Sequence, residues 1–425
     1  MKYSILFLLV IFLGLRSSGQ NIDKIINASE VERMVRVLAS DEMQGRKTFT
    51  PSLDSAAAFI AGEFKKTGLQ YFKDLKGYQQ SFSMQKTTPV ITSGKINNTE
   101  VAPANIISVS TEEHLMVDQN SGYTEVVLDS AANLLSRAFT LTNENKKYIV
   151  WVNKHHEKNF SRLSRLNRES FEPKAPVVFV LTDEKPPNYS FHIQNKITNT
   201  ALANVIGVLP GKSRKDEYVI FSAHYDHIGI GKPDAKGDSI FNGANDNAAG
   251  TTAMMLLAEY FKKLGNNERT LVFVAFTAEE MGGFGSKYFS KSIDPDKAVA
   301  MFNIEMIGTE SKWGTNSAFI TGFEKSDFGT ILQKNLVGSN FKFEPDPYPA
   351  QNLFYRSDNA TLAALGVPAH TISTSKMDSE PNYHKQSDSI ETLDLKNMAE
   401  IIKAIALSSQ TIISGKDTPS RVEKR

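Results

Sequence analysis

The sequence predicts an α/β fold, in which a mainly parallel central sheet is sandwiched by helices and an inserted, mostly β subdomain interrupts the chain. Beyond residue 204, short apolar runs alternate with amphipathic or alanine-rich stretches, which is typical of parallel strands joined by helices. Between residues 87 and 199 the apolar runs are separated by polar stretches rich in Asn and Lys, a pattern that favours β structure. A chain of 425 residues has room for a large domain and a smaller one.

The first residues have the organisation of a signal peptide. Lys2 precedes an apolar run over residues 5–15, and Ser17, Ser18 and Gly19 follow it as a small-residue cleavage site. The run is about half as long as a membrane-spanning helix, and no later segment is long and apolar enough to anchor the chain. We therefore expect residues 1–19 to be removed and the protein to be exported to the bacterial periplasm or beyond; the alternative is an uncleaved anchor.

Residues 20–86 are expected to form an N-terminal helical part of the large domain. Two helical patterns follow one another there, with Ser29 and Ser52 as the expected N-caps and with Gly45 and Pro51 interrupting the connection.

The remaining elements follow from apolar runs and their punctuation. Strands are expected in the insert (87–199) at 148–152 and 177–181, and in the core (200–415) at 218–223, 271–276, 299–304 and 369–373. Helices are expected at 248–264, 283–290 and 395–413. Residues 416–425 are charged and are expected to be a disordered tail.

Composition excludes several classes of function. The 48 Lys and Arg residues balance 47 Asp and Glu residues, so no nucleic-acid or anionic-membrane partner is indicated. The absence of cysteine excludes disulfides, a thiol nucleophile and thiolate metal ligands. The sequence also lacks a Gly-x-Ser-x-Gly elbow and a His-Glu-x-x-His helix. A bound metal would therefore have histidine and carboxylate ligands.

Three of the expected core strands are each followed directly by acidic or histidine side chains. These residues are His224 and Asp226 after the first strand, Glu279 and Glu280 after the second, and Glu305 after the third. Loops add Asp246 and His384. In an open α/β sheet the carboxyl ends of the strands form the functional edge, so these groups converge. Carboxylates gathered in this way repel one another and resist desolvation, which predicts a compensating metal cation.

In order and spacing these stretches resemble the M28 family of zinc aminopeptidases, which have the zinc exopeptidase fold. The stretches that carry the resemblance are 224–226, 245–250, 279–280, 303–308 and 383–388, together with 41–46, 356–358 and 366–368. The resemblance covers most of the chain outside the insert.

The resemblance implies a pair of zinc ions bridged by Asp246. His224 and Glu305 would bind one zinc, and Glu280 and His384 the other. Glu279 would be the general base for a hydroxide shared by the two metals, which attacks the scissile carbonyl. Co²⁺ or Mn²⁺ in place of zinc stays open.

Several neighbours of these ligands are expected to support them. Asp226 is placed to accept the ring proton of His224, and Asp388 is placed likewise for His384. Tyr383 is expected either to donate a hydrogen bond to the oxyanion or simply to pack.

The resemblance also implies one backbone feature, a cis peptide bond between Asp246 and Asn247. The sequence departs from the family pattern at one position. Most relatives carry aspartate at the position of Glu305, whose extra methylene group requires the backbone to retreat or the carboxylate to bind through one oxygen. The identity and affinity of that metal therefore stay open. The other histidines are expected to have surface or packing roles, although His227 lies near enough for a supporting one.

Three functions remain from the sequence. An aminopeptidase would hold the substrate ammonium through carboxylates such as Glu279 and Asp358. A carboxypeptidase or dipeptidase of the same fold would use a cation such as Arg356 to bind the terminal carboxylate. A one-zinc glutaminyl cyclase or an inactive binding protein is the third class, and the complete set of ligands argues against it. The expected partner is a peptide substrate; neither side-chain specificity nor oligomeric state leaves a pattern in the sequence.

Overall fold

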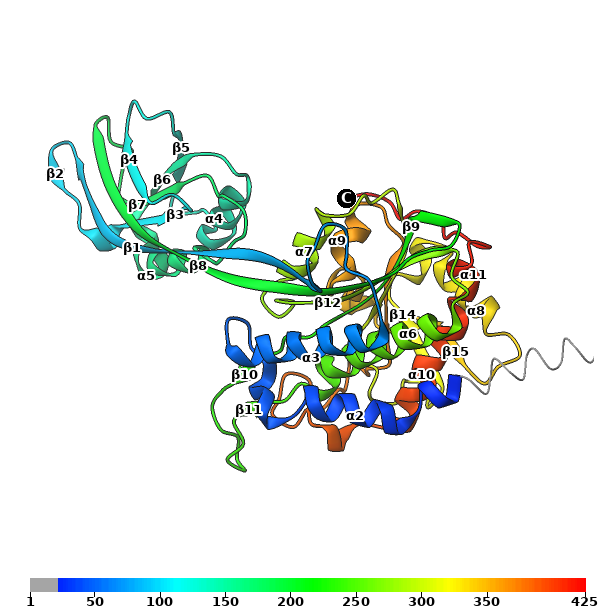
Figure 1. Cartoon of the computed structure of the whole chain (residues 1–425). Coiled ribbons are helices and arrows are strands. Elements are labelled where there is room, and N and C mark those ends of the chain that lie inside the picture. Colours follow the sequence, from blue (N-terminus) through cyan, green and yellow to red (C-terminus); the bar gives the residue numbers. More distant parts are fainter. Residues whose placement is uncertain (1–21) are drawn as a thin grey trace, which may run out of the picture. The chain divides into compact units, whose positions relative to one another are not determined.

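The computed structural model describes residues 22–425, so the predicted signal peptide lies outside the described residues. The chain divides into two compact units (Figure 1). Unit 2 consists of residues 82–201, and unit 1 contains the described residues on either side of it. The expected insert, 87–199, lies within unit 2 and is slightly shorter at both ends.

Two helices begin unit 1, α2 (Ala28–Leu38) and α3 (Pro51–Thr67). The N-cap of α2 is Asn27, whose side chain accepts from the backbone amides of residues 29 and 30, and not the expected Ser29. The N-cap of α3 is Thr50, because Pro51 occupies the first turn, where its missing N–H costs nothing. Both N-caps therefore lie two residues before the expected ones.

The central sheet of unit 1 has four neighbouring parallel strands in the order β12, β9, β13, β16. Their bounds are Arg269–Phe276, Arg214–His224, Ala298–Ile304 and Ala369–Ser373. On one side β8 (Tyr189–Leu209) pairs antiparallel with β12. On the other, β14 (Ser317–Ile320) pairs antiparallel with β16 and parallel with β15 (Lys342–Pro345). The predicted α/β fold with a mainly parallel sheet is confirmed.

Helices cover both faces of this sheet. On one face α6 (Gly250–Leu264) packs against β9 and β12, and α2, α3 and α10 (Leu395–Ser408) pack against α6. On the other face lie α7 (Phe284–Ser290) and α9 (Asn359–Ala364), which contact each other. The short helices α8 (Phe328–Asn335) and α11 (Gln410–Ile413) complete the unit.

Alternation along the strands builds the two layers of the core. Phe221 on β9 packs against Phe261 of α6, with ring centroids 5.4 Å apart, and stacks on Phe273 and Phe302 of the adjacent strands. Its neighbour Ile220 points to the opposite face, into the cluster that contains residues of α7 and α9. Both faces of each central strand are thus buried, which explains why the strands read as continuous apolar runs.

Unit 2 is mostly β, as expected. Its four-stranded sheet has the order β3, β7, β6, β5, with bounds Ile106–Val109, Val177–Leu181, Tyr148–Val152 and Thr124–Leu128. The helix α4 (Leu134–Asn143) and the short α5 (Glu157–Phe160) pack on one apolar cluster of this sheet. A second cluster lies between the sheet and strands β4 (His114–Asp118) and β8. The long strand β1 (Gln79–Ile96) and the two-residue β2 (Thr99–Glu100) complete the unit.

The expectation of a disordered tail at 416–425 was wrong. Val422 is 4% exposed and belongs to the apolar cluster of unit 1, and Arg421 donates to the carbonyl of Ala298 at 2.8 Å. Arg425 lies over the ring of Tyr355. The charged composition suggested a disordered tail, but the guanidinium groups of Arg421 and Arg425 contact a main-chain carbonyl and an aromatic ring of unit 1.

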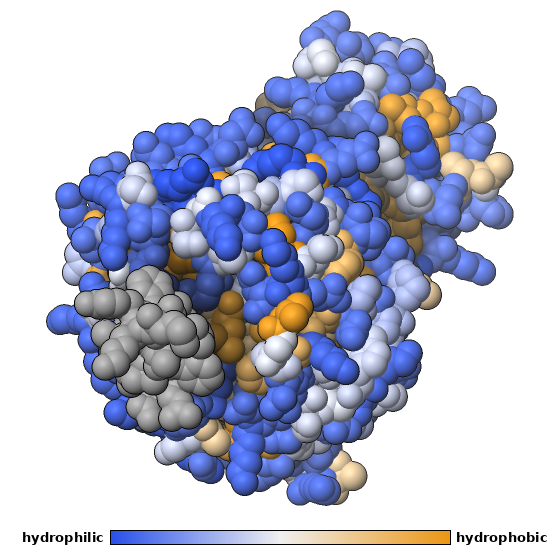
Figure 2. Space-filling model, turned by 90° about the vertical axis from the view of Figure 1, so that its right-hand side faces the viewer, coloured by the Kyte–Doolittle hydropathy of each residue, from blue (hydrophilic) through white to orange (hydrophobic). Residues whose placement is uncertain are grey.

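Among residues 22–425, no helix is long and apolar enough to cross a membrane. The face shown in Figure 2 is mostly hydrophilic, with its apolar residues in separate patches.

Candidate metal centre

The ends of three parallel strands bring acidic residues and a histidine to one edge of the unit 1 sheet. In the pairing of β9 with β12, His224 lies opposite Phe276, the last strand residue before Glu279 and Glu280. In the pairing of β9 with β13, the register places Glu305, the residue after the strand, level with His224. The convergence that the sequence predicted therefore follows from sheet register.

The first group of potential ligands, called here the inner group, consists of His224, Glu305 and one oxygen of Asp246. Their ligand atoms lie within 4.8 Å of one another. His224 Nε2 is 3.3 Å from Asp246 Oδ1. The His224 side chain is 1% exposed, and its Nε2 has no hydrogen-bond partner among the described residues. A buried nitrogen left without a partner beside two carboxylates is what a metal ligand would be in the absence of its ion.

The second group, called here the outer group, surrounds the other oxygen of Asp246. His384 Nε2 lies 3.3 Å from both Asp246 Oδ2 and Glu280 Oε2. His227 Nδ1 lies 2.9 Å from Glu280 Oε1 and 3.9 Å from Asp246 Oδ2. Atoms of His227, Asp246 and Glu280 meet the same 4.8 Å criterion as the inner group. Two histidines therefore face this position, where the sequence predicted one.

Asp246 is 2% exposed and points one oxygen toward each group. Its loop, Ala244–Ala249, leads from β11 (Ile240–Phe241) into α6, and the bond between Asp246 and Asn247 is cis, as the family resemblance implied. The loop starts at Gly243 with φ +59, where a Cβ would lie 2.6 Å from the ring of His227. Glycine is therefore required both by the backbone conformation and by the close approach of that histidine.

The side chain of Asn247 fastens this loop to the end of β13. Its Nδ2 donates to the carbonyl of Ile304 at 3.0 Å, and its Oδ1 accepts from the backbone amides of Gly250 and Met306. The segments that carry Asp246 and Glu305 are thus held by one hydrogen-bond network, although 59 residues separate these two residues in the chain.

Asp388 supports Asp246, a different task from the one expected. Its two carboxylate oxygens accept from the backbone amides of Asn245 at 2.8 Å and Asp246 at 3.0 Å. Burial raises the pKa of Asp388 to about 6, although these amides oppose the shift. The expectation that it accepts the ring proton of His384 finds no contact in the described residues.

The carboxylate of Asp226, like that of Asp388, accepts hydrogen bonds from backbone amides. His224 Nδ1 lies 3.1 Å from the backbone carbonyl of Asp226, whereas the nearest oxygen of its carboxylate is 3.8 Å away. That carboxylate instead accepts from the amides of Glu279 at 3.1 Å and Glu280 at 3.3 Å. Asp226 therefore orients the ring of His224, as expected, but through its backbone carbonyl. Its side chain instead holds the turn that carries Glu279 and Glu280.

The hydroxyl group of Ser357 holds the carboxylate of Glu305. Ser357 donates to Glu305 Oε2, and Ser357 in turn accepts from Asn303 Nδ2 at 2.8 Å. Asn303 Oδ1 accepts from Ser222 at 2.8 Å. One oxygen of the long glutamate side chain is therefore engaged by the protein, which leaves the other for a metal. This arrangement favours binding through one oxygen, one of the two outcomes considered for this departure from aspartate.

A buried arginine ties the loops below the centre together. Arg46 is 0% exposed and donates to the carbonyls of Tyr225 at 2.8 Å, Asn242 at 2.6 Å and Gly243 at 2.8 Å, and also to that of Leu38. Burial lowers the pKa of Arg46 to about 10, and the carboxylates of the centre oppose this shift. Arg46 therefore adds a positive charge beneath the acidic cluster.

Burial and mutual proximity shift the protonation of the centre in the metal-free chain. Burial raises the pKa of Glu280, but hydrogen bonds from His227 and His384 lower it to about 2. Hydrogen bonds to Asp246 and Glu280 raise the pKa of His384 to about 10. Metal binding must therefore release a proton from His384.

Glu279 has a different environment from its neighbour Glu280. Burial raises its pKa well above the usual range, with His224 opposing the shift and the nearby acids reinforcing it. Its side chain lines a cavity together with Glu280. An acid with a raised pKa beside an open cavity has the property required of a general base or acid near neutral pH.

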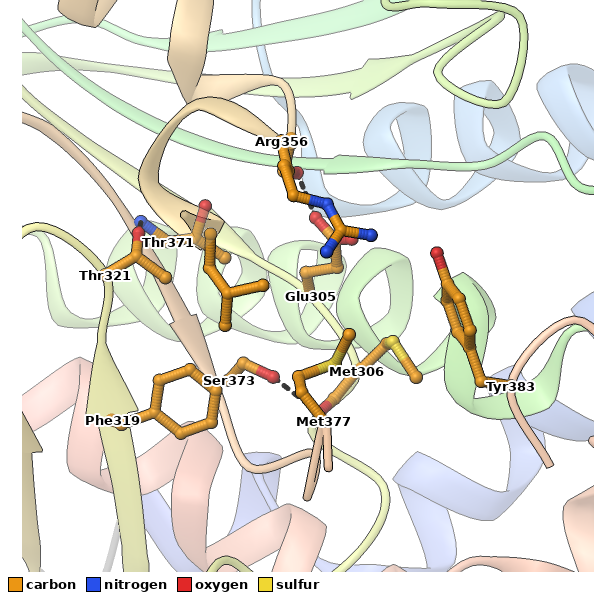
Figure 3. A pocket seen from close by; sticks show the side chains of 11 residues that line it. Glu305, Met306, Phe319, Thr321, Arg356, Thr371, Ser373, Met377 and Tyr383 are labelled. Atoms are coloured by element: carbon orange, nitrogen blue, oxygen red, sulfur yellow. Dashed lines mark hydrogen bonds between the residues drawn. The ribbon is translucent and has the colours of Figure 1, made fainter. Parts of the chain in front are cut away.

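Two cavities adjoin the centre. The apolar cavity, about 50 Å³, has four apolar side chains in its lining, together with hydroxyl groups and with Glu305, Arg356 and Tyr383 at the side of the centre (Figure 3). The apolar residues are Met306, Phe319, Leu353 and Met377, and the hydroxyl groups belong to Thr321, Ser357, Thr371 and Ser373. The polar cavity, about 360 Å³, contains Glu279, Glu280, Ser286, Lys287, Arg356 and Thr361 in its lining.

The three remaining predicted residues lie at different depths. Tyr383 lines the apolar cavity, and its ring stacks on that of His384 with centroids 3.9 Å apart. Arg356 lines both cavities. Asp358 is 1% exposed and lines neither of these cavities, and both of its oxygens lack a hydrogen-bond partner in the described residues. Burial raises its pKa to about 7, opposed by His224. A direct contact of Asp358 with substrate is therefore not favoured.

One residue of the centre was not predicted, and another was given only a supporting role as an alternative. His227 is three residues after His224, and this short spacing was the signal for that alternative. Ser357 lies within one of the stretches that resemble the family, but nothing in the sequence connects its hydroxyl to Glu305.

Comparison with known protein families identifies part of unit 1. Residues 204–408, all within unit 1, match the family model described as Peptidase family M28. This part of the chain belongs to peptidase family M28.

Curated relatives and solved structures extend the likeness. Aminopeptidase YwaD of Bacillus subtilis (strain 168) is 24% identical over 245 residues, covering 54% of this chain and 48% of the relative. A probable leucine aminopeptidase of Trichophyton verrucosum is 30% identical over 217 residues, covering 49% of this chain and 56% of the relative. The chain thus spans about half the length of the curated relatives it matches.

One solved structure, described as BSAP, a zinc aminopeptidase from Bacillus subtilis, superimposes with a TM-score of 0.55 at 18% identity. The superposition covers 94% of this chain and 98% of that one, and at this identity it shows a shared fold.

Proposed function

We propose that this protein is a two-zinc aminopeptidase, which removes residues from the amino end of peptides. The observation that carries the proposal is Asp246, a buried carboxylate with one oxygen 3.3 Å from His224 Nε2 and the other 3.3 Å from His384 Nε2. A carboxylate between two sets of nitrogen and oxygen ligands suits a bridge between two cations.

The residues fit zinc. His224, Glu305 and Asp246 would hold one ion, and Glu280, His384 and Asp246 the other, with His227 against Glu280. When bound, zinc ions supply a Lewis acid that polarises a carbonyl and lowers the pKa of water.

The remaining steps belong to the chain. The Glu279 carboxylate takes a proton from the attacking water and delivers it to the leaving nitrogen as the C–N bond breaks. The phenol of Tyr383, at the edge of the apolar cavity, donates to the carbonyl oxygen as negative charge develops there. The excess of carboxylates at the rim favours the positively charged amino end of a peptide, and this supports an aminopeptidase over a carboxypeptidase.

We also propose that the protein is exported, since residues 1–19 have the pattern of a signal peptide. The mature amino terminus, determined by mass spectrometry of protein from the native host, tests this directly. A mature chain that begins after Gly19 supports export with cleavage, whereas a retained Met1 contradicts it.

The test of the activity uses amino-acid anilides and matched peptides with free and acetylated amino ends, with and without a chelator, while bound metal is measured by mass spectrometry. We expect turnover of the free amines, none of the acetylated peptides, two zinc ions per chain and loss of activity with chelator. Equal turnover of acetylated peptides would assign a carboxypeptidase. One metal and a pyroglutamate product would assign a cyclase.

A further inference from the structure

The polar cavity contains two cations whose charges are not used by the proposed chemistry. Lys287 and Arg356 both line it, and both side chains are exposed. Lys287 Nζ donates to the backbone carbonyl of Gly282 at 2.8 Å, and Arg356 Nη1 donates to Gln351 Oε1 at 3.3 Å. Within residues 22–425 neither cation forms an ion pair with a carboxylate. They are thus available to an anionic group of a ligand.

The acidic residues of the same cavity already have other partners or tasks. Glu280 is hydrogen-bonded to His227 and His384, and Glu279 is the proposed base. The two cations therefore share this cavity with acids that the proposed function assigns to the metals and the reaction. A ligand in this cavity meets negative charge at the metal centre and unpaired positive charge at Lys287 and Arg356.

The two cavities differ in a way that orients a peptide. The apolar cavity is small, about 50 Å³, and its wall of Met306, Phe319 and Leu353 suits one uncharged side chain. The polar cavity is larger, about 360 Å³, and suits the part of a peptide that follows the cleaved bond. Because Arg356 lines both cavities, the scissile bond would lie between them, with Glu305 on one side and Glu279 on the other.

We propose that the substrates are short peptides with an apolar first residue and a carboxylate on the second residue, which is bound by Lys287 and Arg356. This proposal rests on the proposed aminopeptidase function and names its substrate class. The carboxylate has two sources, the carboxyl terminus of a dipeptide or an acidic side chain. Both present the same anion to a guanidinium and an ammonium group.

The test compares kcat/KM of the zinc-loaded protein for matched dipeptides. Leu-Ala and its carboxyl-terminal amide test the terminal carboxylate, and Leu-Asp amide against Leu-Asn amide tests the side chain. We expect the charged member of at least one pair to be preferred by about 10-fold or more at low salt, with the preference reduced by added salt.

Variants assign the preference to the two cations. Lys287→Gln and Arg356→Gln are each expected to move the ratio of charged to uncharged substrate toward one. Because each ratio is measured within one variant, a general loss of stability does not affect it. Lys334→Gln, on the exposed side of α8, is the matched control and should keep the wild-type ratio.

Equal turnover of the charged and uncharged members of both pairs overturns this proposal and leaves the aminopeptidase function intact. A preference that persists in both variants also overturns it. If no dipeptide or amide is cleaved by zinc-loaded protein, the aminopeptidase function and this proposal fail together.

Discussion

The inner and outer groups share Asp246 but differ in how firmly the protein holds them. In the inner group the His224 side chain is 1% exposed, its ring is fixed by a main-chain carbonyl, and Glu305 is fixed by Ser357. In the outer group the His384 side chain is 38% exposed and lies 11 residues beyond the end of β16, in the loop that leads toward α10. A site whose ligands are already in place loses less freedom on binding, so the inner position should bind metal more tightly.

The difference also separates the tasks of the two positions. The inner group lies at the end of β13, beside the apolar cavity, whereas Glu280 of the outer group faces the polar cavity. We therefore expect the inner position to hold its metal tightly and the outer position, beside the larger cavity, to be more accessible to substrate. Glu279 belongs to neither group.

The largest effect is expected from Glu279→Gln. Glutamine keeps the shape of the side chain but cannot accept a proton, so kcat should fall by about 10³-fold or more. Since Glu279 belongs to neither group, two zinc ions per chain should remain, as measured by mass spectrometry. A variant that loses metal together with activity would place Glu279 among the ligands.

Removing a histidine from each group should have unequal effects on metal content. His224→Ala leaves Asp246 and Glu305 as the only inner ligands at a buried site, so zinc affinity there should fall by at least about 100-fold. His384→Ala should weaken the outer site alone, with His227 retaining part of the affinity. Calorimetric titration with zinc measures both; equal losses in the two variants would contradict the contrast between the groups.

Ser357 and His227, which contact one candidate ligand in each group, offer a paired test. Ser357→Ala removes the hydroxyl that holds Glu305 and should lower zinc affinity at the inner position by about 10-fold. His227→Gln should do the same at the outer position, because it removes the ring that contacts Glu280. Ser55→Ala, which alters an exposed hydroxyl on α3, is the control. Each variant should change one of the two binding steps and leave the other unaltered.

The smallest effect concerns a histidine away from the centre. His370 is buried, and burial lowers its pKa to about 4, although its hydrogen bond to the carbonyl of Thr321 and the charge of Glu324 oppose this shift. The unfolded chain therefore binds a proton between about pH 6.5 and 4 that the folded chain excludes. The resulting stability is present above pH 6.5 and is lost as pH falls toward 4, by about 3 kcal/mol at most.

The measurement for His370 is urea unfolding of the metal-free protein across that range of pH. His370→Asn should show a shallower loss of stability than the wild type, and the difference between the two slopes isolates this residue. Identical slopes would mean that folding does not lower the pKa of His370, which would contradict this prediction.

The sequence was most informative where one property dominates a segment. The strands at 148–152, 177–181 and 369–373 were predicted to the residue, because segments buried on both faces are apolar throughout. The candidate ligands His224, Asp246, Glu280, Glu305 and His384 could be named from the sequence because strand ends and family motifs coincide there, and the structure brings them together. The contact of Ser357 with Glu305, the use of Asp226 and Asp388 as acceptors for main-chain amides, and the packing of Val422 could not be predicted. They depend on distances between residues far apart in the chain, for which no local pattern exists.

The most direct test of the central claim is the anomalous scattering of zinc in crystals of the protein. Two peaks are predicted, one between His224 and Glu305 and one between Glu280 and His384, with Asp246 between them. Asp246→Asn should lose at least the outer peak. A single peak, or density for zinc only at sites remote from Asp246, would contradict the two-metal account.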